Sequence, residues 1–283
     1  FTPQSASTTT SVNQSNGHGL SMVWTNTAQY DFTIKGGHDF SALIGSEWSR
    51  YNGSSTGGYN DGLIPGFADW EHAYLNNTNG TDNKRVNGAP YDETRGMSLF
   101  ARIGWSWKDR YMLNATIRAD ESSKFAPGHR WGYFPSVSAG WTISEEDFMK
   151  STKGWLDFLK LRASWGQVGN ANINCYQYLA PVTTSNTNYN FGTQAGQSGW
   201  STGSYPSRLA NENVKWETAE QVNIGIDARF LQSRLSLTAD WYVKNTKDWL
   251  VQAPVLATAG TQGPVINGGD VKNTGVELGL TWN

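Results

Sequence analysis

The sequence predicts an all-β fold, an antiparallel up-and-down transmembrane β-barrel of which this chain supplies about nine strands. Three observations predict it. Apolar and polar residues alternate within nine segments, the connections between segments alternate in length, and aromatic residues gather near segment ends. The composition agrees, because 14 Trp, 12 Tyr and 11 Phe stand beside 31 Gly in a chain of 283 residues that is only 37% hydrophobic. Such a mixture suits strands and loops better than helices.

The first four segments are expected to form two hairpins. Their alternate apolar positions are Leu20, Met22, Trp24, Ala28, Tyr30 and Phe32; Phe40, Ala42, Ile44 and Trp48; Met97, Leu99, Ala101, Ile103, Trp105 and Trp107; and Tyr111, Leu113, Ala115, Ile117 and Ala119. A turn with Gly36 and Gly37 joins the first pair, and a turn at 108–110 joins the second. Asn26 is the one polar residue on the apolar parity of the first segment.

The remaining five segments repeat the pattern down to the end of the chain. Their alternate apolar positions are Tyr133, Val137, Ala139, Trp141 and Ile143; Leu159, Leu161, Ala163 and Trp165; Val222, Ile224, Ile226, Ala228 and Phe230; Leu235, Leu237, Ala239, Trp241 and Val243; and Val276, Leu278, Leu280 and Trp282. A period of two places each such set on one face of a strand.

Charged residues avoid the apolar parity of all nine segments. Those within the segments fall on the other parity: Asp39, Glu47, Arg102, Arg118, Asp120, Lys160, Arg162, Asp227, Arg229, Asp240, Lys244 and Glu277. A soluble sandwich with its apolar face inward could show the same alternation, so the pattern alone does not decide between the two architectures.

The connections favour the membrane barrel. The short ones are 33–37, 108–110 and 231–234, with 144–157 intermediate; between them fall 49–96, 121–131, 169–217 and 247–273, so every long connection lies at one end of the sheet. Short turns at one rim and long loops at the other are typical of outer-membrane barrels. Aromatic residues of the apolar parity near segment ends, such as Trp24, Trp107 and Trp282, suit girdles at headgroup level.

An open nine-stranded sheet would leave unpaired backbone groups at both edges. In hydrocarbon each such group costs several kcal/mol, so further strands must complete the sheet. We therefore expect residues 1–283 to be part of a longer barrel.

Six stretches resemble the SusC-like (RagA-like) branch of the TonB-dependent transporters of Gram-negative outer membranes. They are SLFARIGWSWKDRYMLNATIRADESSKF (98–125), RWGYFPSVSAGWTISEEDFM (130–149), WLDFLKLRASWGQVGN (155–170), VKWETAEQVNIGID (214–227), RLSLTADWYVKNTKDWL (234–250) and GGDVKNTGVELGL (268–280). They cover about half of the chain in the order that the family shows.

This resemblance implies a 22-stranded barrel closed by a plug, the architecture of outer-membrane transporters. It implies a location in the cell outer membrane, import of oligosaccharides or peptides, a SusD-like surface lipoprotein as partner, and energy from TonB acting through the plug. On this reading the plug domain and the remaining strands lie outside residues 1–283.

Catalytic and cofactor motifs are missing from the sequence. The four histidines are far apart in sequence, Cys175 is the single cysteine, and no phosphate-binding or nucleophile-elbow motif occurs. We expect no enzyme activity, no cofactor and no metal site. Glu145 and Glu146 stand beside a turn and are expected to belong to a solvated loop. The formal net charge of −2, without runs of like charge, gives a nucleic-acid partner no support.

Two sets of residues are candidates for functional contacts. Loop aromatics could stack on sugar rings or pack the loops together: Tyr59, Trp70, Tyr74, Trp200, Tyr205 and Trp249. Charges facing the lumen could contact the plug or the substrate, or could pair with one another across neighbouring strands: Arg102, Arg118, Asp120, Arg162, Asp227 and Arg229.

Two other classes of function stay open from the sequence. A secreted carbohydrate-binding β-sandwich would bury the apolar parity and present the loop aromatics to glycans. A glycoside hydrolase would need two carboxylates facing each other across a cleft.

Overall fold

The computed structural model describes residues 10–66, 69–184, 188–190 and 200–282. The chain divides into two compact units, one of Phe1–Val23 with Ser49–Thr94 and one of Trp24–Trp48 with Arg95–Asn283. The prediction of an all-β fold is confirmed, because strands dominate and the only helices among the described residues are four short 3₁₀ turns. None of the described helices is long and apolar enough to cross a membrane.

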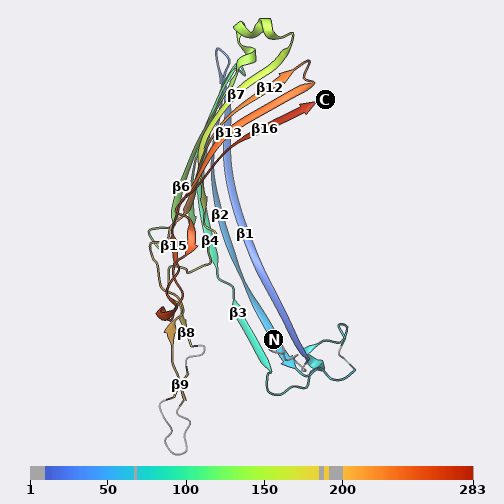
Figure 1. Cartoon of the computed structure of the whole chain (residues 1–283), viewed down its shortest axis with the longest axis vertical. Coiled ribbons are helices and arrows are strands. Elements are labelled where there is room, and N and C mark those ends of the chain that lie inside the picture. The colour runs from blue at the N-terminus through green and yellow to red at the C-terminus, as the bar shows by residue number, and fades with distance from the viewer. Residues whose placement is uncertain (1–9, 67–68, 185–187, 191–199, 283) are drawn as a thin grey trace, which may run out of the picture. The chain divides into compact units, whose positions relative to one another are not determined.

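The main sheet contains all nine predicted strands in chain order, each antiparallel to the next (Figure 1). They are β1 (Ser11–Ile34), β2 (His38–Asp61), β4 (Thr94–Trp107), β5 (Tyr111–Ser122), β6 (Trp131–Thr142), β7 (Leu156–Asn170), β12 (Glu217–Phe230), β13 (Leu235–Lys247) and β16 (Val271–Trp282). The up-and-down order is therefore confirmed, and the described part of the sheet has β1 and β16 at its edges.

Three predicted boundaries are wrong. Strand β1 begins at Ser11, whereas the alternation predicted its start near Leu20. The stretch 49–96 was expected to be a loop, but β2 continues to Asp61 and a further strand, β3 (Arg85–Pro90), pairs with it. These residues lack apolar alternation because both of their parities are polar, so the sequence pattern does not mark them. Ile143 was expected to end the fifth strand and instead begins the 3₁₀ helix η2 (Ile143–Glu145).

The unit of Phe1–Val23 and Ser49–Thr94 has polar contacts between its strands and its loop. Arg50 pairs with Glu93 at 2.7 Å, and the rings of Tyr51 and Tyr91 stack with centroids 6.5 Å apart. The loop after β2 contains the 3₁₀ helix η1 (Leu75–Asn77), and Asn60 donates a hydrogen bond to the Thr78 hydroxyl at 2.8 Å.

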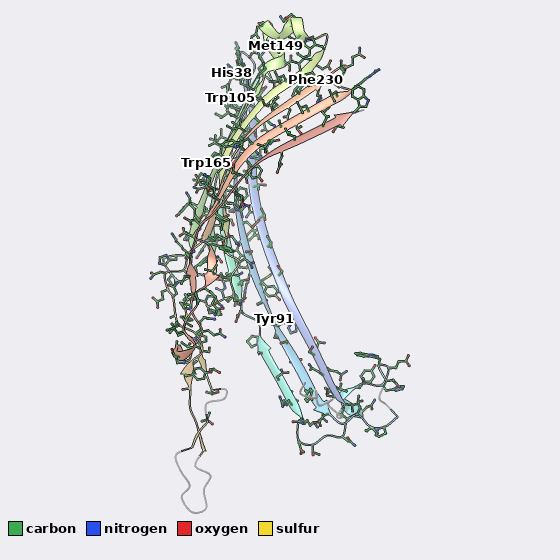
Figure 2. All side chains as sticks on the ribbon, viewed as in Figure 1. His38, Tyr91, Trp105, Met149, Trp165 and Phe230 are labelled. Atoms are coloured by element: carbon green, nitrogen blue, oxygen red, sulfur yellow. The ribbon has the colours of Figure 1, made fainter. Side chains whose placement is uncertain are left out.

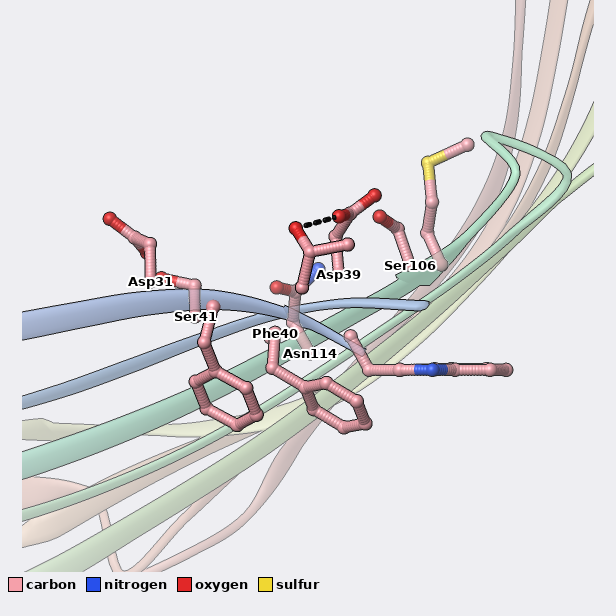
Figure 3. A pocket seen from close by; sticks show the side chains of 11 residues that line it. Asp31, Asp39, Phe40, Ser41, Ser106 and Asn114 are labelled. Carbon is pink, nitrogen blue, oxygen red and sulfur yellow. Dashed lines mark hydrogen bonds between the residues drawn. The ribbon is translucent and has the colours of Figure 1, made fainter. Parts of the chain in front are cut away.

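The second unit has a wall with two chemically different faces. Its apolar parity stays exposed, and no second layer of the described residues packs on this face; examples are Ile44, Leu99, Ile103, Leu113, Ile117, Val137, Ile224, Ile226, Trp241, Leu278 and Leu280. Figure 3 shows the two faces near one turn, with Asp39 and Ser106 on one side of the strands and the Phe40 ring on the other.

The turns of this unit are short at one end of the wall and long at the other. Residues 35–37, 108–110 and 231–234 join strands at the first end, together with η2 and the 3₁₀ helix η3 (Asp147–Thr152). Figure 2 shows His38, Met149 and Phe230 near this end, beyond Trp165. We call it the short-turn rim. Lys108 and Asp109 adopt left-handed backbone conformations there, with φ of 51° and 55°, and the Arg110 amide donates a hydrogen bond to the Trp107 carbonyl at 2.9 Å, which closes the three-residue turn.

Small elements shape the connections at the opposite end, the long-loop rim. They are β8 (Val182–Thr183), β9 (Asn188–Asn190), β10 (Trp200–Thr202), β11 (Tyr205–Pro206), β14 (Leu250–Gln252), η4 (Ala257–Ala259) and β15 (Val265–Asn267). A compact core holds these connections. Phe125 and Val214 are fully buried, and the Trp216 ring lies 5.3 Å from that of Phe125 and 5.5 Å from that of Phe134.

Candidate functional site

The inner face of the wall carries a network of charges centred on Arg162. Its guanidinium contacts Asp227 at 2.7 Å and Asp240 at 3.1 Å, so it joins the carboxylates of two neighbouring strands. Gly225 lies between Arg162 and Asp240 in the cross-strand register, and a side chain there would overlap the Asp240 carboxylate. The missing side chain therefore allows one arginine of β7 to reach β13.

A second group of charges lies around Arg118. This guanidinium contacts Asp120 at 2.7 Å and Glu47 at 3.7 Å, and it lies 5.4 Å from the centre of the Phe100 ring. It also donates a hydrogen bond to Ser98 at 2.9 Å. Four of the six predicted lumen-facing charges, Arg118, Asp120, Arg162 and Asp227, are thus engaged with carboxylates or arginines of the wall.

The other two predicted charges are arranged differently. Arg229 lies 4.9 Å from the centre of the Phe158 ring, which is a cation–π contact. Arg102 is exposed and forms no ion pair with any residue that the structure describes. Of the six predicted charges, these two arginines are the ones that a plug or a substrate could contact without breaking a described ion pair.

The same face has a polar hollow near the short-turn rim. Its volume is about 550 Å³ and its lining includes Asp31, Asp39, Ser41, Ser106 and Asn114 (Figure 3). Thr33 donates a hydrogen bond to Asp39 at 2.6 Å across the first turn. With two carboxylates and no lysine or arginine in its lining, this hollow suits a cationic or hydrogen-bond-donating surface.

A cleft of about 460 Å³ lies among the long connections. Its lining comes from the connection after β7 and from the hairpin of β14 and β15: Asn172, Ile173, Asn174, Gln177, Arg208, Leu250, Val251, Gln252, Gln262 and Val265. Arg208 donates hydrogen bonds to the carbonyl groups of Tyr176 and Leu179, at 3.2 and 3.4 Å, and thereby ties the walls together. Side-chain amides both donate and accept hydrogen bonds, so the cleft suits a polar, uncharged or anionic ligand.

The predicted loop aromatics do not come together in one site. Tyr59, Trp70 and Tyr74 belong to the first unit, where Tyr59 lies in strand β2 and not in a loop, and Trp70 is 96% exposed. Tyr205 and Trp249 are exposed in the second unit, and the side chain of Trp200 falls outside the described residues. None of the five whose side chains the structure describes lines the long-loop cleft.

Comparison with known proteins decides the family. The model of the family described as TonB dependent receptor-like, beta-barrel, matches residues 1–283. The chain belongs to this family. Within it, the chain is SusC/RagA-like, as the six sequence stretches predicted. Barrels of the TonB-dependent receptor family lie in the outer membrane.

Relatives and solved structures agree with that assignment. A TonB-dependent receptor of Formosa agariphila is 35% identical over 214 residues, which are 75% of this chain and 20% of that protein. TonB-dependent receptor SusC of Bacteroides thetaiotaomicron is 38% identical over 189 residues, 65% of this chain and 18% of that protein. The RagAB peptide importer in its closed-closed state superposes with a TM-score of 0.80 and 29% identity over 95% of this chain and 28% of that one.

A more distant structure shares the fold alone. The ferric enterobactin receptor of Pseudomonas aeruginosa superposes with a TM-score of 0.54 at 16% identity, covering 93% of this chain and 33% of that one. The chain spans about a fifth of the length of the curated relatives that it matches. These relatives are named as receptors, and none of their names supports the glycoside hydrolase alternative.

One carboxylate of this TonB-dependent receptor barrel corrects the sequence analysis. Glu146 was expected in a solvated loop, but its side chain is only 13% exposed. It accepts hydrogen bonds from the Tyr111 hydroxyl at 2.8 Å, the Trp141 indole at 3.1 Å and the Arg110 guanidinium at 3.3 Å. The hydrogen bonds from Tyr111 and then Trp141 hold the pKa of Glu146 below its usual value.

Two kinds of candidate residue escaped the sequence analysis. The amide groups of the cleft lie in connections without periodicity, so no sequence signal links 172–177 to 250–265. Glu146 could have been suspected from the aromatic residues at the ends of its two neighbouring strands. Among the described residues there is no group of three or more His, Cys, Asp or Glu side chains that could hold a metal ion.

Proposed function

We propose that this chain forms part of the wall and external mouth of an outer-membrane transporter that imports oligosaccharides or peptides. One observation carries the proposal: the wall has an exposed apolar face and an opposite face of paired charges, on a chain of the TonB-dependent receptor barrel family. A surface that is apolar over many strands is stable only in a nonpolar surrounding. The chain itself catalyses no reaction in this proposal.

The proposed complete molecule is larger than residues 1–283. In hydrocarbon, the backbone groups at the β1 and β16 edges would need partners, so we infer that these nine strands belong to a larger barrel of about 22 strands. Its interior would hold a plug through which TonB delivers energy. Arg102, Arg229 and the polar hollow at the short-turn rim are the proposed contacts for that plug.

The long-loop rim is the proposed entry for the substrate, beneath a SusD-like surface lipoprotein. The cleft of amide side chains supports a ligand rich in hydroxyl or amide groups. The exposed rings of Tyr205 and Trp249 could stack on such a ligand nearby. RagAB is described as a peptide importer, which makes peptides one of the two substrate classes to test.

Membrane fractionation tests the location. The full-length protein that contains this chain is expected in the outer-membrane fraction after a carbonate wash, and it should need detergent for extraction. Recovery in the soluble fraction would contradict the proposal. Co-purification in detergent tests the proposed partner. A lipoprotein should co-purify with the protein, and protease treatment of the external face before extraction should abolish this.

Uptake measurements test the substrate and the cleft. Cells that lack the protein should lose uptake of one labelled class, oligosaccharides or peptides, while retaining the other. Replacing Asn172 and Asn174 by alanine removes two amides of the cleft and should reduce that uptake at limiting substrate. Asn213→Ala, an exposed change in the same connection, is the matched control and should leave uptake unchanged. Equal uptake in all strains would contradict the proposal.

A further inference from the structure

An apolar groove of about 360 Å³ lies on the apolar face of the wall, close to the short-turn rim. Its lining is almost entirely nonpolar and comes from β4, β5, β6 and β7; the residues that shape it are Trp105, Leu113, Ala139, Trp141, Leu161 and Ala163. None of the side chains lining it is charged. The groove shares Trp105 and Met112 with the lining of the polar hollow but none of the hollow's carboxylates, and it shares no residue with the long-loop cleft.

The strand register explains why the groove exists. Leu113, Ala139 and Ala163 are paired in one row across β5, β6 and β7, and two neighbouring positions of that row end at Cβ. The next row towards the short turns pairs Tyr111, Trp141 and Leu161, whose side chains are all large. On the other side, the next row pairs Ala115, Val137 and Trp165. The two alanines thus form a floor between a row of large side chains and a row in which Val137 and Trp165 stand above it.

The polar atoms near the groove are already satisfied. The hydroxyl of Tyr111 and the indole nitrogen of Trp141 donate to Glu146, at 2.8 and 3.1 Å, so neither is available to a ligand in the groove. What remains is a nonpolar channel, continuous with the exposed apolar face around it. Hydrocarbon is the chemistry that fills such a channel without leaving a polar group unpaired.

Charges stand at the rim end of the groove, at the turn between β4 and β5. The Lys108 ammonium lies 5.1 Å from the centre of the Trp107 ring. Arg110 is shared with Glu146 at 3.3 Å and Asp147 at 4.0 Å, and Lys150 pairs with Asp147 at 2.7 Å. Of these cations, Lys108 is the one placed over an aromatic ring, and that Trp107 ring stacks on Tyr111 of the groove lining with centroids 5.7 Å apart.

We propose that this groove binds one acyl chain of a phospholipid of the leaflet at the short-turn rim, with the phosphate of that lipid beside Lys108. The inference rests on the placement of the barrel in the outer membrane but not on what it transports. The chemistry identifies a lipid with a linear hydrocarbon chain and an anionic phosphate. Such a lipid would be retained after detergent extraction, whereas lipids on the remaining apolar face would exchange freely.

Native mass spectrometry of the full-length protein tests this assignment. The purified protein is stripped of lipid and titrated with dioleoyl phosphatidylethanolamine, or with lipid A as the competing source. Ala139→Leu and Ala163→Leu, singly and together, fill the floor of the groove. Ala115→Leu makes the same chemical change on the same face but outside the groove, and it is the matched control.

The wild type and Ala115→Leu should bind one phospholipid equally, and the double variant should bind it about ten-fold more weakly, because a filled floor displaces one to two methylene groups from contact. Lys108→Gln should weaken retention of phosphatidylethanolamine without affecting that of a dodecane-chain detergent. Equal retention in the double variant, or preferential retention of lipid A, would overturn the proposal. Heat-modifiable migration on gels checks that each variant is folded; if the double variant is not, the single Ala163→Leu variant decides.

Discussion

The two rims of the apolar face each carry a glutamate bonded to a tryptophan, but the two glutamates are held differently. At the short-turn rim, Glu146 belongs to a connection and accepts hydrogen bonds from Tyr111, Trp141 and Arg110. At the long-loop rim, Glu220 belongs to strand β12 and accepts from Trp165 at 2.8 Å and Lys247 at 2.7 Å. Its side chain is 23% exposed, against 13% for Glu146.

This difference shows how each rim holds its connections. At the short-turn rim, a carboxylate clamps the segment 143–155 onto the aromatic residues that end the strands. At the long-loop rim, β12 and β13 continue beyond their apolar residues. Glu220 is the first charged residue of β12 on the apolar parity. The long connections there are held by a separate core around Trp216. Replacing Glu146 should therefore loosen its connection more than replacing Glu220 loosens the long loops.

The largest effect is expected at the core of the long-loop rim. Trp216→Ala removes the ring that contacts Phe125 and Phe134, and the indole hydrogen bond to the Arg130 carbonyl at 2.8 Å. Because the ring is only partly buried, the free energy of local opening should fall by about 2 kcal/mol, which is roughly thirty-fold in proteolysis of the segment 171–216. Trp249→Ala, an exposed ring in the next long connection, should change cleavage little. Equal cleavage in the two variants would show that no such core holds the loops.

A smaller effect is expected from Glu146→Gln. The amide oxygen can still accept from Tyr111 and Trp141, which share one carboxylate oxygen, but the NH2 group then faces Arg110 and the charge that Arg110 contacts is lost. Proteolysis within 143–155 should accelerate several-fold while cleavage of the long loops stays unchanged. Glu145→Gln, at an exposed neighbour, is the control. Acceleration in the control alone would reverse our assignment of the clamp.

Acid should weaken the same clamp. The pKa of Glu146 in the folded state lies below its usual 4.5, mainly because of the Tyr111 and Trp141 hydrogen bonds, so the charged form is favoured by folding. The ionised Glu146 carboxylate contributes fully to the stability of the folded state above about pH 4.5. This contribution is lost as the pH falls through the lower pKa that Glu146 has in the folded state. Hydrogen exchange of 143–155 should accelerate over that window in the wild type but not in Glu146→Gln. An identical pH profile in both would exclude the role of this carboxylate.

The smallest effect is expected from Glu220→Gln. Trp165 can still donate to the amide oxygen, and a surface pair such as Lys247 with Glu220 contributes little in water. Proteolysis at both rims should match the wild type. A change as large as that of Glu146→Gln would mean that the two rims are held in the same way after all.

The sequence predicts the wall well because one face of every strand must be apolar, and a period of two is then unavoidable. Leu99 through Trp107 and Tyr111 through Ala119 were found for this reason. Where both faces of a strand are polar, as in β2 after Trp48, the period disappears and the strand was taken for a loop. Glu146 was misjudged because two of its three partners, Arg110 and Tyr111, are more than 30 residues away and reach it only when β5 and β6 pair.

The candidate site was predicted less well than the wall. The predicted charges lie on the expected face because parity fixes the face, but their pairing depends on which strands are neighbours and on gaps such as Gly225. The amides of the long-loop cleft and the spread of the aromatics over two units depend on the path of the connections, which residue spacing does not record. Whether these residues contact a substrate or a plug stays a prediction.

The position of Gly225 has a mechanical consequence. Because Gly225 has no side chain to separate Arg162 from Asp240, Arg162 connects three adjacent strands. From its place in β7 it is bonded to Asp227 of β12 and Asp240 of β13. Sliding any one of these strands along its neighbours would break at least one bond of this guanidinium. Such a crosslink resists shear, so a load pulling on the inner surface would be shared by three strands and would not peel one of them away.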